Sequence, residues 1–418
     1  MKTISSKIVL LVTMTLFLSA AVTKSQNSET YYSISGVVKD KSTGKAVKYV
    51  NVSAKGTHVG TVTNEDGEFM LKIQKSLSVN EIELSCIGYF NAKAAVSKKI
   101  EQNQNFYIIP QSFQINEIEV FSWKNPCDLV ELAMEKIEKN YSMSPNLLTG
   151  FYRETIQKKG NFIHISEAVI QVYKTSYMMN VDNDKVQILK GRKLISSKKN
   201  DTLDVKFIGG PNMPVVLDIV KNPDIVLSKE DLDFYSFKMG ETTSINDKLQ
   251  YVVHFQPQVN MSYPLYNGTL YIDRENFSIS RAEFSIDMSD KSKVIDAILK
   301  DKPLGLRFTP EEVTYTVTYK QLNNKTYLNY INNVVKFKCD WKRKLFATYF
   351  VINNETVITD IEENNVSKIA AKDAFSTRKS LSYEVAAYFD EDFWGAYNII
   401  EPSESLENAV NRLKKHQK

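Results

Sequence analysis

The chain has 418 residues, of which 43% are hydrophobic and 24% are charged, and this composition is typical of folded globular proteins. The length predicts two or three domains, and the composition excludes an intrinsically disordered chain and a multi-span membrane protein. Of the formal net charge of +4, three charges come from Lys2, Lys7 and Lys24 near the N-terminus, so the rest of the chain is close to neutral. We therefore expect no nucleic-acid partner.

Residues 1–25 predict a signal peptide for export. Lys2 and Lys7 form a charged start, residues 8–22 form an apolar run, and Ser25 is a small residue suited to cleavage. The apolar run is short for a bilayer crossing, so we expect the signal to be cleaved rather than kept as an anchor. The mature protein is then expected in the periplasm or associated with the outer membrane.

Cys86, Cys127 and Cys339 make an odd number of cysteines for an exported protein. Cys86 and Cys339 alternate with apolar neighbours, which favours buried free thiols. A single disulfide is the alternative, and the sequence does not choose its pair.

Residues 26–120 predict a small β-sandwich. Short β-rich runs from residue 34 to residue 96 are separated by turn signals such as Asp66-Gly67. Apolar residues recur at every second position, as in the stretch Phe69–Ile73, which is the period of a strand with one buried face. Strands so short and so regularly spaced leave no room for a catalytic cleft.

The same segment contains a characteristic set of turn and strand residues, which are Asp40, Thr43, Gly44, Val50, Val52, Gly56, Thr57, Gly60, Thr61, Val62, Thr63, Asp66, Gly67, Phe69, Ile87, Gly88 and Tyr89. Through these residues the segment resembles the carboxypeptidase-regulatory-like (transthyretin-like) domain, which is common at the N-terminus of outer-membrane proteins and TonB-dependent receptors of Bacteroidetes. That domain is the non-catalytic part of certain carboxypeptidases, so the resemblance implies a binding or scaffolding role.

Residues 121–147 predict a linker and a helix. Asn125-Pro126 breaks the chain, and Asp128 is the expected N-cap of a helix from Leu129 to about Tyr141. The helix has an apolar stripe, so we expect it to pack on the domain that follows.

Residues 148–370 predict one large, strongly curved antiparallel sheet. Residues 313–319 alternate between apolar or aromatic residues and threonine, Asn323-Asn324 predicts a turn, and residues 326–331 return as a strand. From Val335 to Trp341 the apolar residues share one face and the charged residues share the other, which predicts a strand with one dry and one wet side. The fold class is therefore mainly β, with an N-terminal β-sandwich, a large curved antiparallel sheet and a few helices.

The second domain resembles the half-barrel of lipoprotein carriers of the Lol type, through Tyr266, Gly268, Leu270–Asp273, Ile279 and Ala282–Ile286. That resemblance implies a concave sheet that could hold an apolar ligand. Four aromatic residues would then line the concave face, and a filled core is the alternative for all four. These residues are Tyr315, Tyr319, Phe337 and Trp341.

Residues 371–418 predict an aromatic and acidic segment followed by a helical tail. Phe389, Phe393 and Trp394 lie among three acidic residues and are candidates for docking a partner, with core packing as the alternative. Ser403 or Ser405 is the expected cap of the tail helix, whose apolar residues fall on one face.

One pattern points to an enzyme. His164, Glu167 and His254 match the two-histidine, one-carboxylate ligand set of metallocarboxypeptidases. However, residues 162–173 predict a strand, in which His164 and Glu167 face opposite sides and could not bind one zinc ion. We therefore expect no catalytic residues, no metal and no cofactor. Asp182-Asn183-Asp184 likewise predicts a surface turn rather than a calcium site.

Taken in order of preference, three functions remain open. The first is an exported, non-enzymatic cell-envelope protein that serves as an interaction or scaffold module for an outer-membrane assembly, with an outer-membrane or periplasmic protein partner. The second is a periplasmic carrier of an apolar, lipid-like ligand. The third is a zinc-dependent hydrolase that uses His164, Glu167 and His254.

Overall fold

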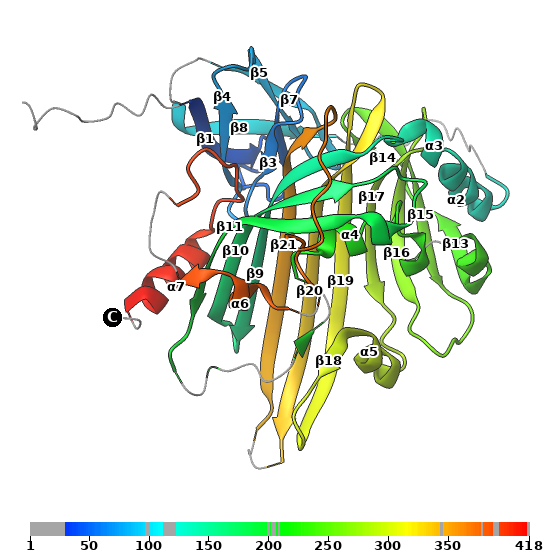
Figure 1. Cartoon of the computed structure of the whole chain (residues 1–418). Coiled ribbons are helices and arrows are strands. Elements are labelled where there is room, and N and C mark those ends of the chain that lie inside the picture. The colour runs from blue at the N-terminus through cyan, green and yellow to red at the C-terminus, as the bar shows by residue number, and fades with distance from the viewer. Residues whose placement is uncertain are drawn as a thin grey trace, which may run out of the picture.

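The computed structural model describes residues 30–96, 101–111, 123–198, 201, 206–207, 210–226, 228–342, 346–377, 379–387 and 393–415. The predicted signal peptide and Phe389 lie outside these residues. The described chain forms a small β-sandwich that sits at one end of a large curved sheet (Figure 1). The expected fold class is therefore confirmed.

Two four-stranded sheets form the N-terminal sandwich. Every second residue of β1 is buried, because its inner face packs on the opposite sheet while its outer face stays partly in water. At the turn before β4, Gly67 has a φ of +75° and an added Cβ would lie 2.8 Å from the Val38 carbonyl oxygen, so only glycine fits there. In sheet order, the strands are β4 (Glu68–Gln74), β1 (Tyr31–Asp40), β8 (Glu101–Pro110) and β6 (Tyr89–Phe90), and then β3 (Gly60–Val62), β2 (Asn51–Ala54), β5 (Glu81–Ser85) and β7 (Ala92–Ala95).

The second domain is built on a 12-stranded sheet, whose neighbours are antiparallel except for the parallel pair β11 and β22. Its strands, in sheet order, are β13 (Tyr235–Met239), β15 (Lys248–Pro257), β16 (Tyr266–Asp273), β17 (Ile279–Ile286), β19 (Leu306–Leu322), β20 (Lys325–Trp341), β21 (Thr348–Glu362), β9 (Asn146–Lys158), β10 (Asn161–Lys174), β11 (Lys185–Ile195) and β22 (Ala386–Ala387), with β14 (Thr243–Ile245) paired to β15. A separate pair is formed by β12 (Lys206–Phe207) and β18 (Leu299–Asp301).

The longest hairpin joins β19 and β20, each of 17 residues. Asn323 and Asn324 both have positive φ angles, of 50° and 62°, which is the geometry of the tight turn that the Asn-Asn pair predicts. Residues 326–331 and 335–341 belong to the single strand β20. Its charged residues from Lys336 to Asp340 lie on the wetter side, as predicted.

The large sheet curls so far that β10 and β11 cross in front of β19–β21 (Figure 1). Helix α4 (Met213–Val216) contacts both β10 and β20, and therefore lies between the two limbs of the curl. The 3₁₀ turns η2 (Pro223–Ile225) and η3 (Lys229–Phe234) follow it. The segment from α4 to η3 thus occupies the concave side of the sheet.

Helices cover the ends and the outside of the sheet. The predicted helix near residue 129 exists as α2 (Pro126–Glu135), followed by the short α3 (Ile137–Asn140). Its N-cap is Asn125 rather than the expected Asp128, because the Asn125 side chain accepts a hydrogen bond from the Cys127 backbone N–H. The other elements are η1 (Val181–Asn183), α5 (Lys291–Ile298), α6 (Leu381–Glu384) and α7 (Glu404–Lys415).

The tail helix α7 packs on β10 and β11 through Leu406, Ala409, Val410 and Leu413, which are the residues of its predicted apolar face. Of the two predicted caps, Ser403 lies directly before the helix, and its hydroxyl accepts from the Leu406 N–H at 3.4 Å.

A segment of residues 393–403, which we name the strap, joins the sandwich to the large sheet. Asn398 exchanges two hydrogen bonds, of 2.7 and 2.9 Å, with the backbone of Lys72 in β4. Thr61 of β3 donates to the Ile399 carbonyl at 2.7 Å, and Arg153 of β9 donates to the Ile400 carbonyl at 2.7 Å. The strap therefore binds both domains at once.

Among the described residues, no disulfide joins Cys86, Cys127 and Cys339. Within the same residues, no helix has both the length and the apolar character needed for a membrane span.

Candidate functional site

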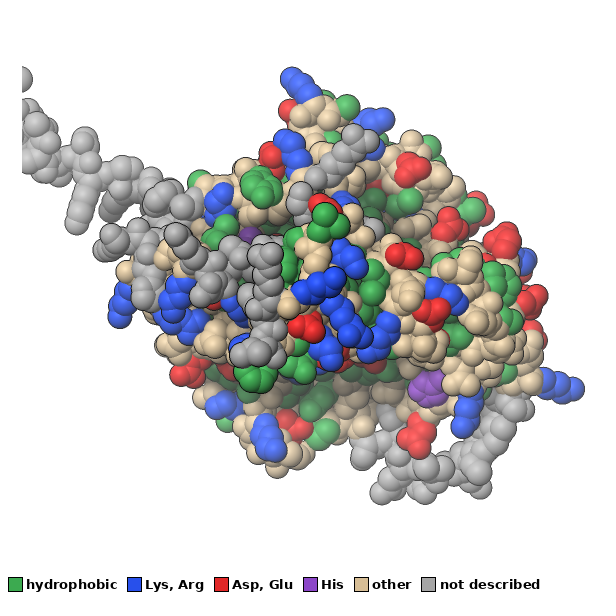
Figure 2. Space-filling view, turned by 90° about the horizontal axis from the view of Figure 1, so that it is seen from below, with side chains coloured by type: hydrophobic (Ala, Val, Ile, Leu, Met, Phe, Trp, Pro, Cys, Tyr) green, Lys and Arg blue, Asp and Glu red, His purple; other side chains and the backbone are tan. Residues whose placement is uncertain are grey.

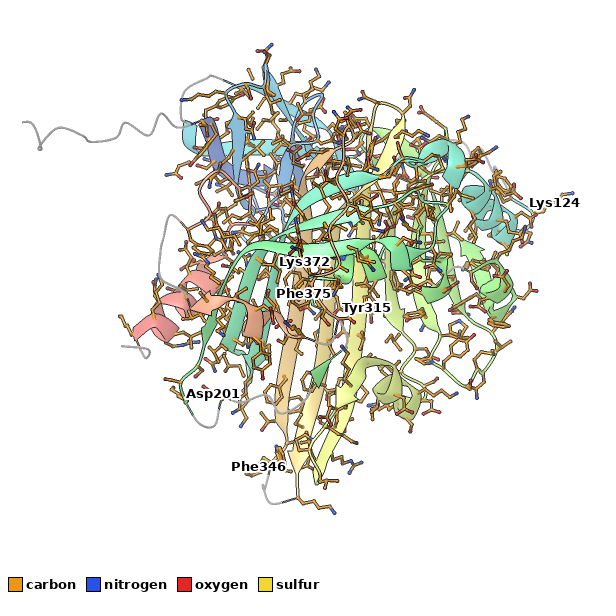
Figure 3. The ribbon with its side chains drawn as sticks, viewed as in Figure 1. Lys124, Asp201, Tyr315, Phe346, Lys372 and Phe375 are labelled. Atoms are coloured by element: carbon orange, nitrogen blue, oxygen red, sulfur yellow. The ribbon has the colours of Figure 1, made fainter. Side chains whose placement is uncertain are left out.

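The four aromatic residues expected to line the concave face lie on that face, but they do not meet at one point. Tyr319 is 4% exposed and belongs to the cluster near α4, whereas Phe337 is fully buried in a second cluster at the other end of the sheet. Tyr315, which is labelled in Figure 3, packs against both clusters. Its ring stacks on that of Phe284, with the centroids 4.9 Å apart. Trp341 is half-buried beside the second cluster.

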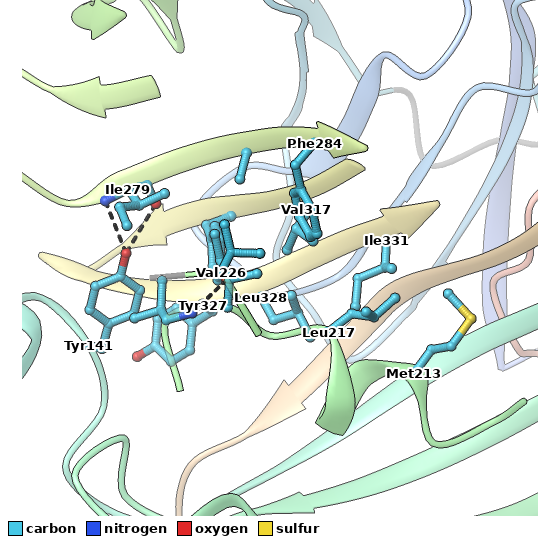
Figure 4. Packing of buried hydrophobic residues seen from close by; sticks show 14 of the residues in the cluster. Tyr141, Met213, Leu217, Val226, Ile279, Phe284, Val317, Tyr327, Leu328 and Ile331 are labelled. Atoms are coloured by element: carbon cyan, nitrogen blue, oxygen red, sulfur yellow. Dashed lines mark hydrogen bonds between the residues drawn. The ribbon is translucent and has the colours of Figure 1, made fainter. Parts of the chain in front are cut away.

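The concave side near α4 is filled by the chain itself. The segment that crosses it contributes apolar side chains that pack against β17, β19 and β20 (Figure 4). Close packing of this kind leaves the facing aromatic rings in contact with protein rather than with open space. The contributing residues are Met213, Leu217, Ile219, Val220, Val226 and Leu232.

The same segment carries two charged residues into the interior. Asp218 lies 2.7 Å from the ammonium group of Lys174 in β10, and Lys221 lies 2.7 Å from Asp184. All four side chains are at most 1% exposed. Because buried charges are tolerated only when they are paired, this network fixes where the segment docks on the sheet.

Hydroxyl groups complete the network. Tyr177 and Tyr319 donate to the two oxygens of Asp218 at 2.9 and 2.8 Å. Burial, together with the charge of Asp218, raises the pKa of both phenols well above the ordinary value, so they remain proton donors. Tyr319 therefore has a structural partner on the concave face.

This network was not predicted from the sequence. Asp184 was expected in a surface turn, but it points inward and accepts from the N–H and hydroxyl of Thr175 at 2.8 Å. The available signal was Asp218 and Lys221, two opposite charges three residues apart within an otherwise apolar stretch. Their partners on β10 and near β11 could not be chosen without the fold.

A second buried ionic cluster lies on the convex face. Glu167 of β10 accepts from Arg153 of β9 and from Arg192 of β11, each at 2.8 Å. Burial alone would raise the pKa of Glu167, but the two guanidinium groups hold that pKa below its ordinary value. Since Arg153 also donates to Ile400, this cluster attaches the strap to the sheet.

The aromatic residues proposed for partner docking begin the strap. Trp394 is only 4% exposed, because its ring packs edge-on against Phe151 at 5.3 Å. In this arrangement Trp394 packs in the core, which was the alternative considered for it, and its role in docking a partner stays a prediction. Phe393 is half-buried, and the ammonium group of Lys190 lies 4.4 Å from its ring.

The residues of the zinc-hydrolase hypothesis are not brought together. His164 lies on the concave side and contacts Ser166 at 2.6 Å, whereas Glu167 faces the convex side and is held by two arginines. His254 is on β15, where it contacts Thr269. Among the described residues, no group of three or more His, Cys, Asp or Glu side chains is placed to hold a metal.

The pH dependence of stability is expected to carry a contribution from His164. Burial, reinforced by Lys193, lowers the pKa of this imidazole to about 4. The unfolded chain takes up the proton near pH 6.5, so the contribution is complete above that pH and is lost as the pH falls toward 4. Between pH 7 and pH 5, the free energy of unfolding should therefore fall by about 2 kcal/mol more in the wild type than in His164→Gln.

Urea denaturation at the two pH values measures this difference. His254→Gln is the matched control, since that ring is exposed, and it should follow the wild type. Equal slopes for wild type and His164→Gln would mean that the imidazole titrates normally.

One known protein family matches the N-terminal part of the chain. Residues 34–120 match the family model described as the CarboxypepD_reg-like domain. This agrees with the resemblance seen in the sequence, and it covers only the N-terminal part of the chain. No curated protein matches the chain.

Among solved structures, the chain is similar to a putative outer membrane lipoprotein-sorting protein domain from Vibrio parahaemolyticus, with 12% identity, a TM-score of 0.25, and 58% of this chain and 94% of that chain covered. A LolA superfamily protein from Nitrosomonas europaea shows 11% identity and a TM-score of 0.24, with 57% and 94% covered. A putative membrane-associated protein of unknown function from Bacteroides fragilis shows 9% identity and a TM-score of 0.16, with 79% and 98% covered. These scores are too low to carry a functional conclusion.

Proposed function

We propose that this protein is an exported, non-enzymatic scaffold of the cell envelope that works against the periplasmic surface of a membrane, as part of an outer-membrane assembly with a protein partner. The matched N-terminal domain supports an envelope role. The sealed concave face favours a protein that acts through its surface. The observation that carries the membrane contact is the end of the large sheet opposite the sandwich.

That end exposes large apolar side chains. Leu304, in the turn before β19, is fully exposed, and Phe346, before β21, is 80% exposed. The two turns are neighbours, because Leu306 pairs with Trp341 across the hairpin and the Lys342 N–H donates to the Gly305 carbonyl. Phe346 lies at the extreme end of the molecule (Figure 3). Exposed apolar residues at a projecting tip are suited to the interface of a bilayer.

Basic residues surround this tip. Figure 2 looks at the molecule from this end and shows Lys and Arg side chains gathered near the middle of the face, beside hydrophobic ones. Among the described residues of these turns and strand ends, the exposed cations outnumber the acids, which are the exposed Asp301 and the half-buried Asp340. Anionic lipid headgroups attract such a surface, which commits the proposal to a lipid surface. The cations are Lys159, Lys302, Arg307 and Lys342.

Vesicle flotation tests the proposal. The wild-type protein should float with vesicles that contain phosphatidylglycerol and far less with pure phosphatidylcholine. The double variant Leu304→Glu, Phe346→Glu should lower the partition coefficient by about tenfold or more, because two apolar side chains no longer enter the interface. Tyr383→Glu is the control, since Tyr383 on α6 is also 80% exposed and lies away from the tip. Equal flotation of the double variant and this control would overturn the proposal.

A second candidate is a carrier of a lipid-like ligand, and the aromatic concave face favours it. This function requires the segment from α4 to η3 to leave the sheet, which breaks the ion pairs of Asp218 and Lys221. Mass spectrometry of the purified protein distinguishes the two. The scaffold is expected without bound lipid, and a stoichiometric acyl lipid would favour the carrier.

A further inference from the structure

A cavity of about 260 Å³ lies between the two domains, on the convex face of the large sheet. The sandwich contributes Tyr49 and Cys86 to its walls, and the sheet contributes Arg281, Lys320 and Tyr330 from β17, β19 and β20. Neither domain forms the cavity alone. The sandwich, which supplies one of its walls, lies at the opposite end of the large sheet from the start of β19 and the end of β20 (Figure 1).

Lys320 is the unusual group in this cavity. Its side chain is 9% exposed, and its ammonium group donates to the His58 carbonyl oxygen at 2.7 Å. Among the described residues no carboxylate lies within 4 Å of this ammonium group, although the more distant charge of Asp360 acts on it and an ammonium group has three N–H donors. Burial lowers the pKa of Lys320 to about 8. A buried cation whose counter-ion is not in contact with it is costly, so an anion in the cavity would offset part of that cost.

The charge of the walls has one sign. Lys48, Arg281 and Lys320 line the cavity, and none of the described lining residues is Asp or Glu. The guanidinium group of Arg281 contacts one Glu283 oxygen, at 2.8 and 2.5 Å, so that one of the three positive charges is partly balanced from outside the cavity. Glu355 and Asp360 act on Tyr330 and Lys320 from outside the lining, so the charged groups that face the cavity itself are cations and favour an anion there.

One wall is aromatic. The rings of Tyr49 and Tyr330 stack with centroids 5.6 Å apart and planes 28° apart, one ring from each domain. Val62 and Ile87 add apolar surface, while Thr316, Thr318 and Asn332 offer hydrogen-bonding groups. A pocket with an apolar body and a few polar groups suits a small organic molecule.

From these contacts we infer that the interdomain cavity binds a small organic oxyanion, a carboxylate or a phosphate with a compact apolar or aromatic body. The charged group pairs with Lys320 and Arg281, and the body lies against Tyr49 and Tyr330. The bound molecule would contact both domains and so strengthen their docking. This inference is independent of the membrane contact proposed above.

Titration calorimetry with 4-bromobenzoate and 4-bromophenyl phosphate tests the inference, with 4-bromobenzamide as the neutral analogue and inorganic phosphate as the anion without a body. At least one organic anion should bind more tightly than both comparison compounds. Lys320→Met should weaken that binding by about tenfold or more, which is the value of a charge-assisted hydrogen bond. Arg281→Met should also weaken the binding of the organic anion. The matched control is Lys336→Met on β20, whose ammonium group is exposed and paired with Glu312.

Crystals soaked in the same compounds locate the bromine by its anomalous signal, which is expected beside the rings of Tyr49 and Tyr330. The inference is overturned if 4-bromobenzamide or inorganic phosphate binds as tightly as the organic anions. It is also overturned if Lys320→Met and Arg281→Met both bind the organic anion as tightly as the wild type does, or if the bromine lies outside the interdomain cavity.

Discussion

Replacing Asp218 by leucine is expected to lower the free energy of unfolding by about 3–5 kcal/mol. The substitution removes the carboxylate that lies 2.7 Å from the ammonium group of Lys174. Lys174 and Lys221 must then share Asp184, at 3.6 and 2.7 Å, so one buried positive charge is left uncompensated. The substitution also removes the acceptor of the Tyr177 and Tyr319 hydroxyls. The loss should exceed that of an ordinary core substitution, because the uncompensated charge cannot reach water without opening the interior. Urea denaturation of the wild type and the variant measures this difference in the free energy of unfolding.

Two further variants make this prediction specific. Glu312→Leu removes the carboxylate from an exposed ion pair with Lys336, and it should lower the free energy of unfolding by at most about 1 kcal/mol. Adding Lys174→Met to Asp218→Leu should recover part of the stability, because the double variant has no unpaired charge at this position. A single Asp218→Leu variant as stable as Glu312→Leu would show that water reaches this network.

Replacing Glu167 by glutamine is expected to lower the free energy of unfolding by a similar amount, about 3–5 kcal/mol, and to weaken the attachment of the strap. The change leaves Arg153 and Arg192 side by side and buried, with exposures of 3% and 6%, around a neutral amide. Arg153 also holds the Ile400 carbonyl, so a displaced guanidinium group weakens the attachment of the strap. Hydrogen exchange should therefore speed up at Asn398 and at its hydrogen-bond partner Lys72, in addition to the fall in overall stability.

Trp394→Phe provides the comparison for this variant. It removes part of a buried ring without creating a charge, so it should destabilise the strap less than Glu167→Gln does. If Glu167→Gln exchanged no faster than the wild type at Lys72, the strap would be held by its aromatic contacts and by the Asn398 hydrogen bonds instead.

The sheet elements were predictable because their information is local. From residue 313 to 319, alternation of aromatic or aliphatic residues with threonine required a strand with two different faces, and β19 has them. Asn323-Asn324 required a turn because both residues tolerate positive φ. The helix near residue 129 was predictable for the same reason, although the choice between Asn125 and Asp128 as its cap depended on one hydrogen bond.

The candidate site was predictable only in part. Periodicity placed Tyr315, Tyr319, Phe337 and Trp341 on one face, but it could not say whether that face is open or filled. Phe393 and Trp394 were predicted to dock a partner, with core packing as the alternative, and only the fold shows that Trp394 lies on Phe151. The partners in such cases are far apart in sequence, and nothing local selects them.

By itself, the sequence determined two β modules, the type of the first module, and the separation of His164 from Glu167, because side chains on a strand alternate with a period of two. Only the tertiary structure decided that residues 213–232 fill the concave face, that Asp218 and Lys221 find Lys174 and Asp184, and that Lys320 lies in a cavity between domains. The physical reason is that strand periodicity is a property of neighbouring residues. Burial and charge pairing depend on which distant segments the fold brings together.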